Sequence, residues 1–295
     1  MKCDLSNKNL SAAKKAKNDE FYTRCEDVEN ELVHYKEHFK NKTVYCNRND
    51  PEKSEFWKFF QRNFEAWSLK RLIATNYEMD KKNYAYFIEK NIGDDLNSEP
   101  ERKPLNCNGD FRSDPCIDLF KQADIVVTNP PFSLFREYVA QLIEFNKKFL
   151  IIGNMNAITY KEIFPLLKEN KIWLGYTSTK QFLQPNNEIK KFGNILWFTN
   201  LDHKKRHDKI DLRGNFYKPE KYPKYDNYDA IEVSKVANIP DNYNGVMGVP
   251  ITFLDKYCPE QFDILGLDRY IVSKKYLVGG RVAINGKPCY ARVLV

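Results

Sequence analysis

Hydrophobic residues follow two alternating spacings along the chain between residues 27 and 202. Helical spacing is clearest over 52–64, where four phenylalanines fall at i, i+3, i+4 and i+8: Phe56, Phe59, Phe60 and Phe64. Short apolar runs lie between such segments, and the run DIVVT at 124–128 is hydrophobic enough to be buried on both faces. This alternation predicts an α/β fold.

The individual elements follow from the same spacings. They predict helices over 27–39, 52–64, 117–122, 134–145 and 157–168, and strands over 43–46, 71–75, 124–128, 149–152, 172–174 and 195–198. The stretch 78–109 is polar, contains Pro100 and Pro104, and is expected to be irregular. Strands that alternate with helices in this way form a mostly parallel sheet covered on both faces.

The composition and periodicity of the chain change near residue 203. Segments such as YPKYDNYDA and PDNYNGVMGVP are rich in tyrosine, aspartate and proline and have no clear period. The first residues are lysine-rich and have no period that could bury a face. We therefore expect a flexible basic arm over 1–18, a domain over 19–202 and a second region over 203–295.

Composition narrows the class of protein. A chain of 295 residues with 42% hydrophobic residues can bury a full core, and its net charge of +7 is compatible with a polyanionic partner. No apolar run approaches the roughly 20 residues that span a bilayer, and the first residues lack the apolar centre of a signal peptide. We expect a cytoplasmic protein without a membrane partner.

The cysteines and histidines show no metal-binding spacing. Seven cysteines form no C-x-x-C pair, and the four histidines do not lie near them at zinc-finger spacing. Free thiols and no metal site are expected.

Asn129-Pro130-Pro131-Phe132 directly follows the predicted strand 124–128. Ligands of open parallel sheets bind at the carboxyl ends of the strands, so this corner is expected to face a ligand. The Asn129 amide oxygen and the Pro130 carbonyl can accept both hydrogens of an exocyclic amino group, while Phe132 offers a flat face to an aromatic base. As an alternative, Asn-Pro-Pro is an ordinary turn between a strand and a helix.

This arrangement suits methyl transfer to an aryl amine. A sulfonium donor such as S-adenosylmethionine carries a good leaving group, so positioning and electrostatics supply most of the rate without a metal or covalent intermediate. If the amine belongs to a base in a duplex, that base must be flipped into the site at a cost of a few kcal/mol.

The N-P-P-F segment resembles the D/N/S-P-P-Y/F motif of S-adenosylmethionine-dependent amino-methyltransferases. From residue 17 to residue 295 the chain is similar to the EcoRI-type adenine-specific (N6) DNA methyltransferases, in blocks such as NDEFYTRCEDVENEL, TVYCNRNDPEKSEFWKFF, GDFRSDPCIDL, DIVVTNPPFSLFREY, LWFTNLDH and GVMGVPITFLDKY. The resemblance implies a Rossmann-like, S-adenosylmethionine-dependent methyltransferase sheet over 19–202 and a smaller C-terminal DNA-recognition region over 203–295.

The same resemblance implies how the protein works with its partners. It implies site-specific methylation of a flipped adenine in double-stranded DNA, within a short A/T-containing site, by a bacterial or phage-encoded enzyme. We expect a monomer that pairs functionally with a restriction endonuclease without forming a stable complex.

Candidate cofactor residues precede and follow the first predicted strands. The resemblance implies that the F-x-T-like motif binds the methionyl carboxylate of the cofactor. It also implies that the glycine-free loop YCNRNDP is the first cofactor loop, in which Asp50 contacts the methionyl ammonium. The residues concerned are Phe21, Tyr22 and Thr23, then Cys46, Asn47 and Asp50. Alternatively, the segment ending at Thr23 only leads into a helix.

Two further segments offer groups to the nucleoside part of the cofactor. Asn76, Tyr77 and Glu78 follow the strand 71–75 and offer a carboxylate or amide to the ribose hydroxyls, as an acid does in many nucleotide-binding sheets. By resemblance, Asp110 accepts from the adenine amino group of the cofactor and Phe111 packs on its ring. A solvated turn at 76–78 and a Gly-Asp turn at 109–110 are the alternatives.

Basic runs near both ends of the predicted catalytic domain are candidates for DNA phosphate contacts: Lys14, Lys15 and Lys17, and Lys204, Lys205 and Arg206. Each run is also compatible with a solvated surface. The tyrosine-rich segment 222–228 and the loop 241–245 either contact base edges or are packing aromatics and turns.

Two other functions remain open from the residues. N-P-P-Y/F also occurs in methyltransferases that act on RNA guanine N2 or protein glutamine, and a methyltransferase fold that lost catalysis could serve as a DNA-binding module. The basic C-terminal region favours DNA over a protein substrate, and the intact Asn129 and Phe132 favour catalysis.

Overall fold

The computed structural model describes residues 22–48, 50–78, 84–95, 100–183, 189–272 and 280–295. The predicted arm 1–18, with Lys14, Lys15 and Lys17, and the candidate Phe21 lie outside these residues. Two compact units make up the chain: the first comprises Met1–Ala157 and Gly175–Asp202, the second Ile158–Leu174 and His203–Val295. The second unit thus also takes in residues 158–174. The functions assigned to the two parts of the chain stay predictions.

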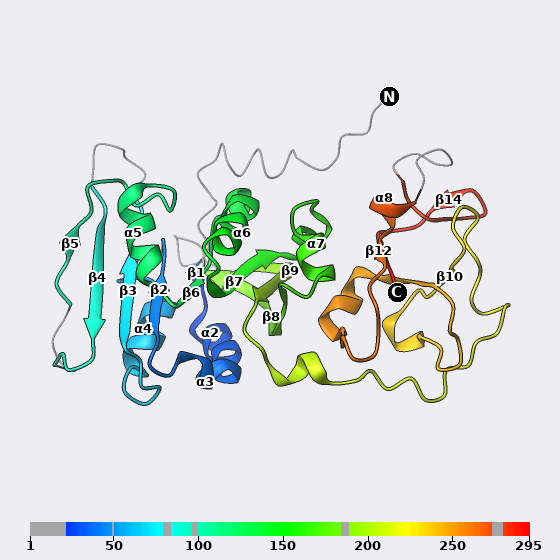
Figure 1. The fold of residues 1–295 in the computed structure, drawn as a ribbon, viewed down its shortest axis with the longest axis horizontal. Coiled ribbons are helices and arrows are strands. Elements are labelled where there is room, and N and C mark those ends of the chain that lie inside the picture. The colour runs from blue at the N-terminus through cyan, green and yellow to red at the C-terminus, as the bar shows by residue number, and fades with distance from the viewer. Residues whose placement is uncertain (1–21, 49, 79–83, 96–99, 184–188, 273–279) are drawn as a thin grey trace, which may run out of the picture. The chain divides into compact units, whose positions relative to one another are not determined.

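A large mixed sheet organises the first unit, and the architecture is α/β (Figure 1). Within the described residues it has nine strands, in the order β1-β8-β9-β7-β6-β2-β3-β4-β5. The strands are β1 (Tyr22–Thr23), β2 (Thr43–Cys46), β3 (Arg71–Thr75), β4 (Tyr86–Asn91), β5 (Lys103–Pro104), β6 (Ile125–Thr128), β7 (Lys148–Asn154), β8 (Trp173–Leu183) and β9 (Ile189–Thr199).

The direction of the strands differs between the centre and the flanks of this sheet. β7, β6, β2 and β3 are parallel neighbours. On one side β4 and β5 pair antiparallel, and on the other β9 pairs antiparallel with β7 and β1 with β8. The prediction of a mostly parallel sheet is therefore correct for the four central strands and wrong for the flanks.

The helices of the described chain as far as residue 168 are α2 (Cys25–Leu32), η1 (Val33–Tyr35), α3 (Lys36–Phe39), α4 (Glu55–Arg62), α5 (Asp114–Gln122), η2 (Phe132–Leu134), α6 (Phe135–Glu144), η3 (Met155–Thr159) and α7 (Phe164–Lys168). α4 begins after Ser54, whose Oγ accepts a hydrogen bond from the Trp57 amide. The single helix predicted over 157–168 is wrong. Pro165 lies in the first turn of α7, where proline is tolerated, but it cannot continue a helix from upstream.

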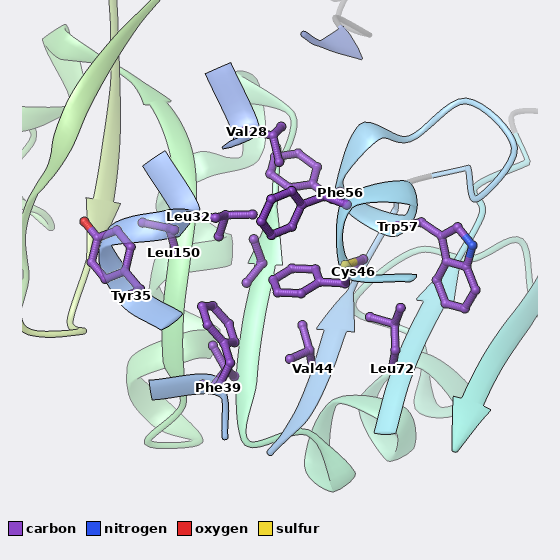
Figure 2. Close-up of a cluster of buried hydrophobic side chains, with 14 of the residues drawn as sticks. Val28, Leu32, Tyr35, Phe39, Val44, Cys46, Phe56, Trp57, Leu72 and Leu150 are labelled. Carbon is purple, nitrogen blue, oxygen red and sulfur yellow. The ribbon is translucent and has the colours of Figure 1, made fainter. Parts of the chain in front are cut away.

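The core of the first unit forms where α2, α3 and α4 cover β2 and β3. Figure 2 shows Phe56 and Trp57 beside Cys46 and Leu72, with Leu32 nearby. The four phenylalanines of the predicted helix face are all buried: Phe56, Phe59, Phe60 and Phe64. The helical spacing over 52–64 therefore identified the buried face correctly.

The segment 78–109, expected to be irregular, contains β4 and β5. β4 pairs with β3 from Phe87 to Asn91. Buried and half-buried side chains alternate along β4, and one of the buried positions is Lys90, which is 4% exposed. The Lys90 ammonium lies 5.8 Å from the centre of the Phe64 ring. A lysine at an inward position interrupts the apolar alternation by which a strand is recognised.

The second unit contains a small sheet in the order β10-β11-β15-β12 and a separate two-stranded hairpin, β13-β14. Its strands are β10 (Ile231–Glu232), β11 (Met247–Pro250), β12 (Gly266–Leu267), β13 (Ala283–Ile284), β14 (Lys287–Pro288) and β15 (Arg292–Leu294). Its helices besides α7 are η4 (Lys204–His207), η5 (Val236–Asn238), η6 (Ile251–Lys256) and α8 (Asp268–Ile271).

Two tyrosines of the segment 222–228 are buried in the second unit, Tyr222 and Tyr225. The packing interpretation of these two residues is therefore the correct one, and they do not present their rings to a base edge. Among the described residues, no helix is both long and apolar enough to cross a membrane.

Candidate active site at the carboxyl edge of the sheet

The order of the central strands defines where a ligand is expected. The chain leaves β2 for β3 on one side, whereas β6 pairs with the other side of β2. The loops that follow β2 and β6 therefore diverge, and open α/β sheets bind ligands in the crevice at such a switch point. Asn47 follows β2 and Asn129 follows β6, so both asparagines lie at this point.

Buried hydrogen bonds join the ends of the three central strands β6, β2 and β3. Thr128 donates from Oγ1 to the Asn47 carbonyl at 2.5 Å. Thr75 donates from Oγ1 to Oδ1 of Asn47 at 3.2 Å and accepts from the Arg48 amide at 3.2 Å. Thr75, Thr128 and Asn47 are each at most 1% exposed. In such a buried network every partner restricts the others, so the strand ends are held in one arrangement.

The Asn129 side chain meets a second candidate residue from the far end of the chain. Its Nδ2 lies 3.5 Å from Oγ1 of Thr23, to which it donates. Thr23 is buried in β1, which pairs with β8. Two candidates that are 106 residues apart are thus brought together at one site.

The rest of the N-P-P-F corner is rigid. Pro130 is buried, Pro131 has φ −57°, and the Pro131 carbonyl accepts from the Leu134 amide at 2.9 Å. Phe132 begins η2 and is half-buried, with part of its ring packed against the core. Both prolines lack a backbone donor, so these two positions offer only carbonyl acceptors.

The glycine-free loop after β2 uses an arginine where a left-handed residue is needed. Arg48 has φ +54°, and its guanidinium lies 3.8 Å from the centre of the Tyr77 ring. Further along the loop, Asp50 accepts from the Tyr86 hydroxyl at 3.4 Å and from the Glu52 amide at 3.1 Å. Asp50 is thereby connected to Tyr86 of β4, and Tyr77 is connected to Arg48.

Cys46 differs from the other candidates of this loop. Its side chain is fully buried beneath α4, among the residues of Figure 2, and burial raises the pKa of its thiol. The thiol belongs to the core, and a cofactor contact by Cys46 stays a prediction. Only the backbone of Cys46 adjoins the site.

The loop after β3 lies against the segment that contains Asp110. Asn76 donates from Nδ2 to Glu78 at 2.9 Å and accepts at Oδ1 from the Tyr86 amide at 2.7 Å. The Glu78 amide donates to the Asn108 carbonyl at 2.9 Å. Gly109 has φ +80°, and a Cβ there would lie 2.1 Å from the Asn76 carbonyl oxygen. Glycine is therefore required for this close approach.

Asp110 and Phe111 have different surroundings. Arg112 donates to the Asp110 carboxylate from Nε at 2.9 Å and from Nη2 at 2.7 Å, and these bonds lower the pKa of Asp110. The carboxylate is therefore ionised at neutral pH. Phe111 is 1% exposed and packs edge-on against Tyr138, with ring centres 4.9 Å apart.

The basic run of η4 belongs to the second unit. Lys205 forms an ion pair with Asp255 at 2.7 Å, and Arg206 donates to Asn170 at 2.8 Å while lying over the Trp173 ring. Lys204 is exposed. Phosphate binding by this run stays a prediction, and two of its three side chains also have partners within the unit.

Several residues of the site were not found from the sequence: Arg48, Thr75, Tyr86, Gly109 and Thr128. A place directly after a predicted strand singled out the three asparagines that follow β2, β3 and β6: Asn47, Asn76 and Asn129. Tyr86 gave no such signal, since it belongs to a strand that was not predicted.

Comparison with known proteins identifies the family to which the chain belongs. The model of the family described as adenine-specific methyltransferase EcoRI matches residues 9–295. The chain is 47% identical to the type II methyltransferase M.EcoRI of Escherichia coli, over 99% of this chain and 97% of the relative. It is 40% identical to the type II methyltransferase M.MgeORF184P of Mycoplasma genitalium, over 97% of this chain and 98% of the relative.

A third relative is the type II methyltransferase M.MpnI of Mycoplasma pneumoniae, 42% identical over 87% of this chain and 84% of the relative. No solved structure matched the chain. The family match and these identities extend over nearly the whole sequence, including the N-P-P-F corner. The chain belongs to the EcoRI family of adenine-specific methyltransferases.

Proposed function

We propose that this protein transfers a methyl group from S-adenosylmethionine to N6 of an adenine at a specific site in double-stranded DNA. The observation that carries the proposal is the position of Asn129, at the switch point of the sheet and bonded to Thr23. The sheet is Rossmann-like, the first unit is catalytic, and the second recognises DNA. Membership of an adenine-specific family speaks against guanine N2 and glutamine as targets.

The loops at the switch point carry side chains that fit the cofactor. A methionyl ammonium, ribose hydroxyls and the adenine amino group of the cofactor need acceptors, and Asp50, Glu78 and Asp110 supply carboxylates on adjoining loops. Thr23 and neighbouring amides would hold the methionyl carboxylate. When bound, S-adenosylmethionine supplies a methyl group on a sulfonium centre with a good leaving group.

The N-P-P-F corner orients the acceptor amine. Oδ1 of Asn129 and the Pro130 carbonyl accept the two N6 hydrogens, which favours the geometry in which the nitrogen lone pair is freed from the ring. Phe132 stacks on the flipped base and offsets part of the few kcal/mol that unstacking costs. Because these groups are fixed before the substrate arrives, they need little reorganisation in the transition state.

The protein acts as a monomer and pairs functionally with a restriction endonuclease without a stable complex. Expression in bacterial cells that lack adenine methylation tests the function directly. Sequencing of their DNA is expected to show N6-methyladenine at one short motif, and an Asn129→Ala variant expressed to the same level provides the background. Methylcytosine, or no methylated motif, would contradict the proposal.

Replacing Gly109 with alanine is expected to weaken cofactor binding at least about tenfold. The added Cβ would lie 2.1 Å from the Asn76 carbonyl, so the loops that carry Glu78 and Asp110 must separate. Calorimetric titration with S-adenosylmethionine measures the change in Kd. A tenfold loss corresponds to about 1.4 kcal/mol, well below the total binding free energy.

Gly93→Ala is the matched control for this prediction. Gly93 also has a positive φ, +91°, but a Cβ there would meet nothing within 4 Å. The control carries the backbone strain of about 1–3 kcal/mol without the collision. If both variants bind the cofactor like the wild-type protein, the Asn76 contact does not shape the site.

A further inference from the structure

A short hairpin stands at the surface of the second unit (red, near the label β14 in Figure 1). β13 and β14 are joined by Asn285 and Gly286, whose φ values are +51° and +72°. Two central residues with positive φ define the type I′ turn that suits a two-residue hairpin. Residues 285–288 are exposed, and Tyr290, just beyond β14, is 87% exposed.

Polar side chains from residues 226 and 227 fix the first leg and the tip. Asp226 accepts at Oδ2 from the Gly286 amide at 2.8 Å, and its own amide donates to the Ala283 carbonyl at 2.8 Å. Asn227 accepts at Oδ1 from the Ala283 amide and donates from Nδ2 to the Arg281 carbonyl, at 3.0 and 2.8 Å. The hairpin is thus bonded on both sides of its turn.

A buried ion pair lies just beyond the second leg, where the chain enters β15. Arg292 donates from Nε and Nη2 to the Glu232 carboxylate, with 11% and 9% of the two side chains exposed, and the Tyr225 hydroxyl donates to the same carboxylate. Nη1 of Arg292 also lies 3.5 Å from the Tyr290 carbonyl, to which it donates. A buried pair adds little net stability compared with apolar residues, but it can fix one arrangement of the chain.

The side chains presented by the hairpin are largely exposed. The Tyr290 ring gains almost no burial, and Asn285 and Lys287 project from exposed positions. Burial lowers the pKa of Arg281 at the base of the hairpin. The Asp268 carboxylate raises this pKa, and the like charges of Arg269 and Arg292 lower it. An arginine stays charged under such a shift, so Arg281 carries a positive charge at the base of the hairpin, near the Asp268 carboxylate.

We propose that the hairpin 281–290 reads the target sequence in the DNA major groove. A two-stranded ribbon fits that groove, and an asparagine amide can donate to and accept from one adenine edge. Asn285 contacts the base edge, Lys287 a phosphate, and Tyr290 packs against a base or thymine methyl beside it. This inference rests on the proposed function and adds the element that determines its sequence specificity.

Asn285→Gly and Tyr290→Ala test the inference. Glycine keeps the left-handed backbone of the turn and removes only the amide, and Tyr290 lies outside the turn. Phe216→Ala is the control, because Phe216 is another exposed aromatic of the second unit, 56% exposed. The measurements are kcat/KM on duplex DNA that contains the wild-type motif, the genome-wide map of methylated sites, and Kd for S-adenosylmethionine.

Each hairpin variant is expected to lose about tenfold to a hundredfold in kcat/KM on that motif, since one base contact discriminates by this much. The methylation map of each hairpin variant should extend to motifs that differ by one base pair, and its Kd for S-adenosylmethionine should be unchanged. The map of the control Phe216→Ala should equal that of the wild-type protein. Wild-type rates and maps in both hairpin variants would overturn the inference while leaving the proposed function standing. Absence of DNA methylation by the wild-type protein would overturn both.

Discussion

Asn129→Ala is expected to lower the rate of methyl transfer about 100-fold or more, with nearly unchanged affinity for S-adenosylmethionine. The alanine removes the Oδ1 acceptor, an interaction realised mainly in the transition state, and such losses appear in kcat rather than in binding. It also removes the donor to Thr23, which is 3.5 Å away. Single-turnover transfer to duplex DNA and calorimetric titration with the cofactor measure the two quantities separately.

Asn129→Asp separates the two roles of this side chain. Aspartate keeps an acceptor oxygen for the N6 hydrogens, and the Thr23 hydroxyl can donate to it in place of the lost amide. We expect this variant to transfer methyl groups faster than Asn129→Ala by about tenfold or more. Near wild-type turnover in Asn129→Ala would remove the role assigned to Asn129.

Phe132→Ala is expected to lower kcat/KM for DNA about tenfold to a hundredfold, because one base–aromatic stack contributes about 1–3 kcal/mol. The alanine leaves the flipped adenine without a stacking face, so capture of the base becomes less favourable. Steady-state kinetics with a varied duplex concentration measures the effect, and a fluorescent adenine analogue at the target position reports flipping independently.

Phe132→Tyr is the matched control, because it keeps the ring and adds only a hydroxyl. Part of the Phe132 ring packs against the core, so the alanine variant is also expected to lose stability. Thermal unfolding separates that loss from catalysis. If Phe132→Ala lowers the unfolding midpoint but keeps kcat/KM, Phe132 is a packing residue.

The central strands could be predicted from the sequence because they are short, apolar and buried on both faces. β2, β3 and β6 differ from their predicted bounds by at most one residue. β4 could not be predicted, since its inward Lys90 is accommodated by the Phe64 ring, a contact that depends on the tertiary fold. The antiparallel flanks were also missed, because the direction of a strand depends on how its connection crosses the sheet.

The residues of the candidate site, too, could be predicted only in part from the sequence. Asn129 and Phe132 were predicted because prolines after a buried strand indicate a rigid corner at the ligand-binding edge. Thr75 and Thr128 were missed, since a threonine at the end of a strand has no distinctive pattern until its partner Asn47 is known. Cys46 was placed in the loop, but the alternation of side chains along β2 directs its thiol into the core.

Transfer of labelled methyl groups from S-adenosylmethionine to unmethylated duplex DNA by the purified protein tests the central claim most directly. The product is digested to nucleosides, and a tRNA and a protein mixture serve as alternative substrates. We predict that the label appears in N6-methyladenine from DNA and is absent with Asn129→Ala. Label in another nucleoside, or in RNA or protein but not in DNA, would contradict the account.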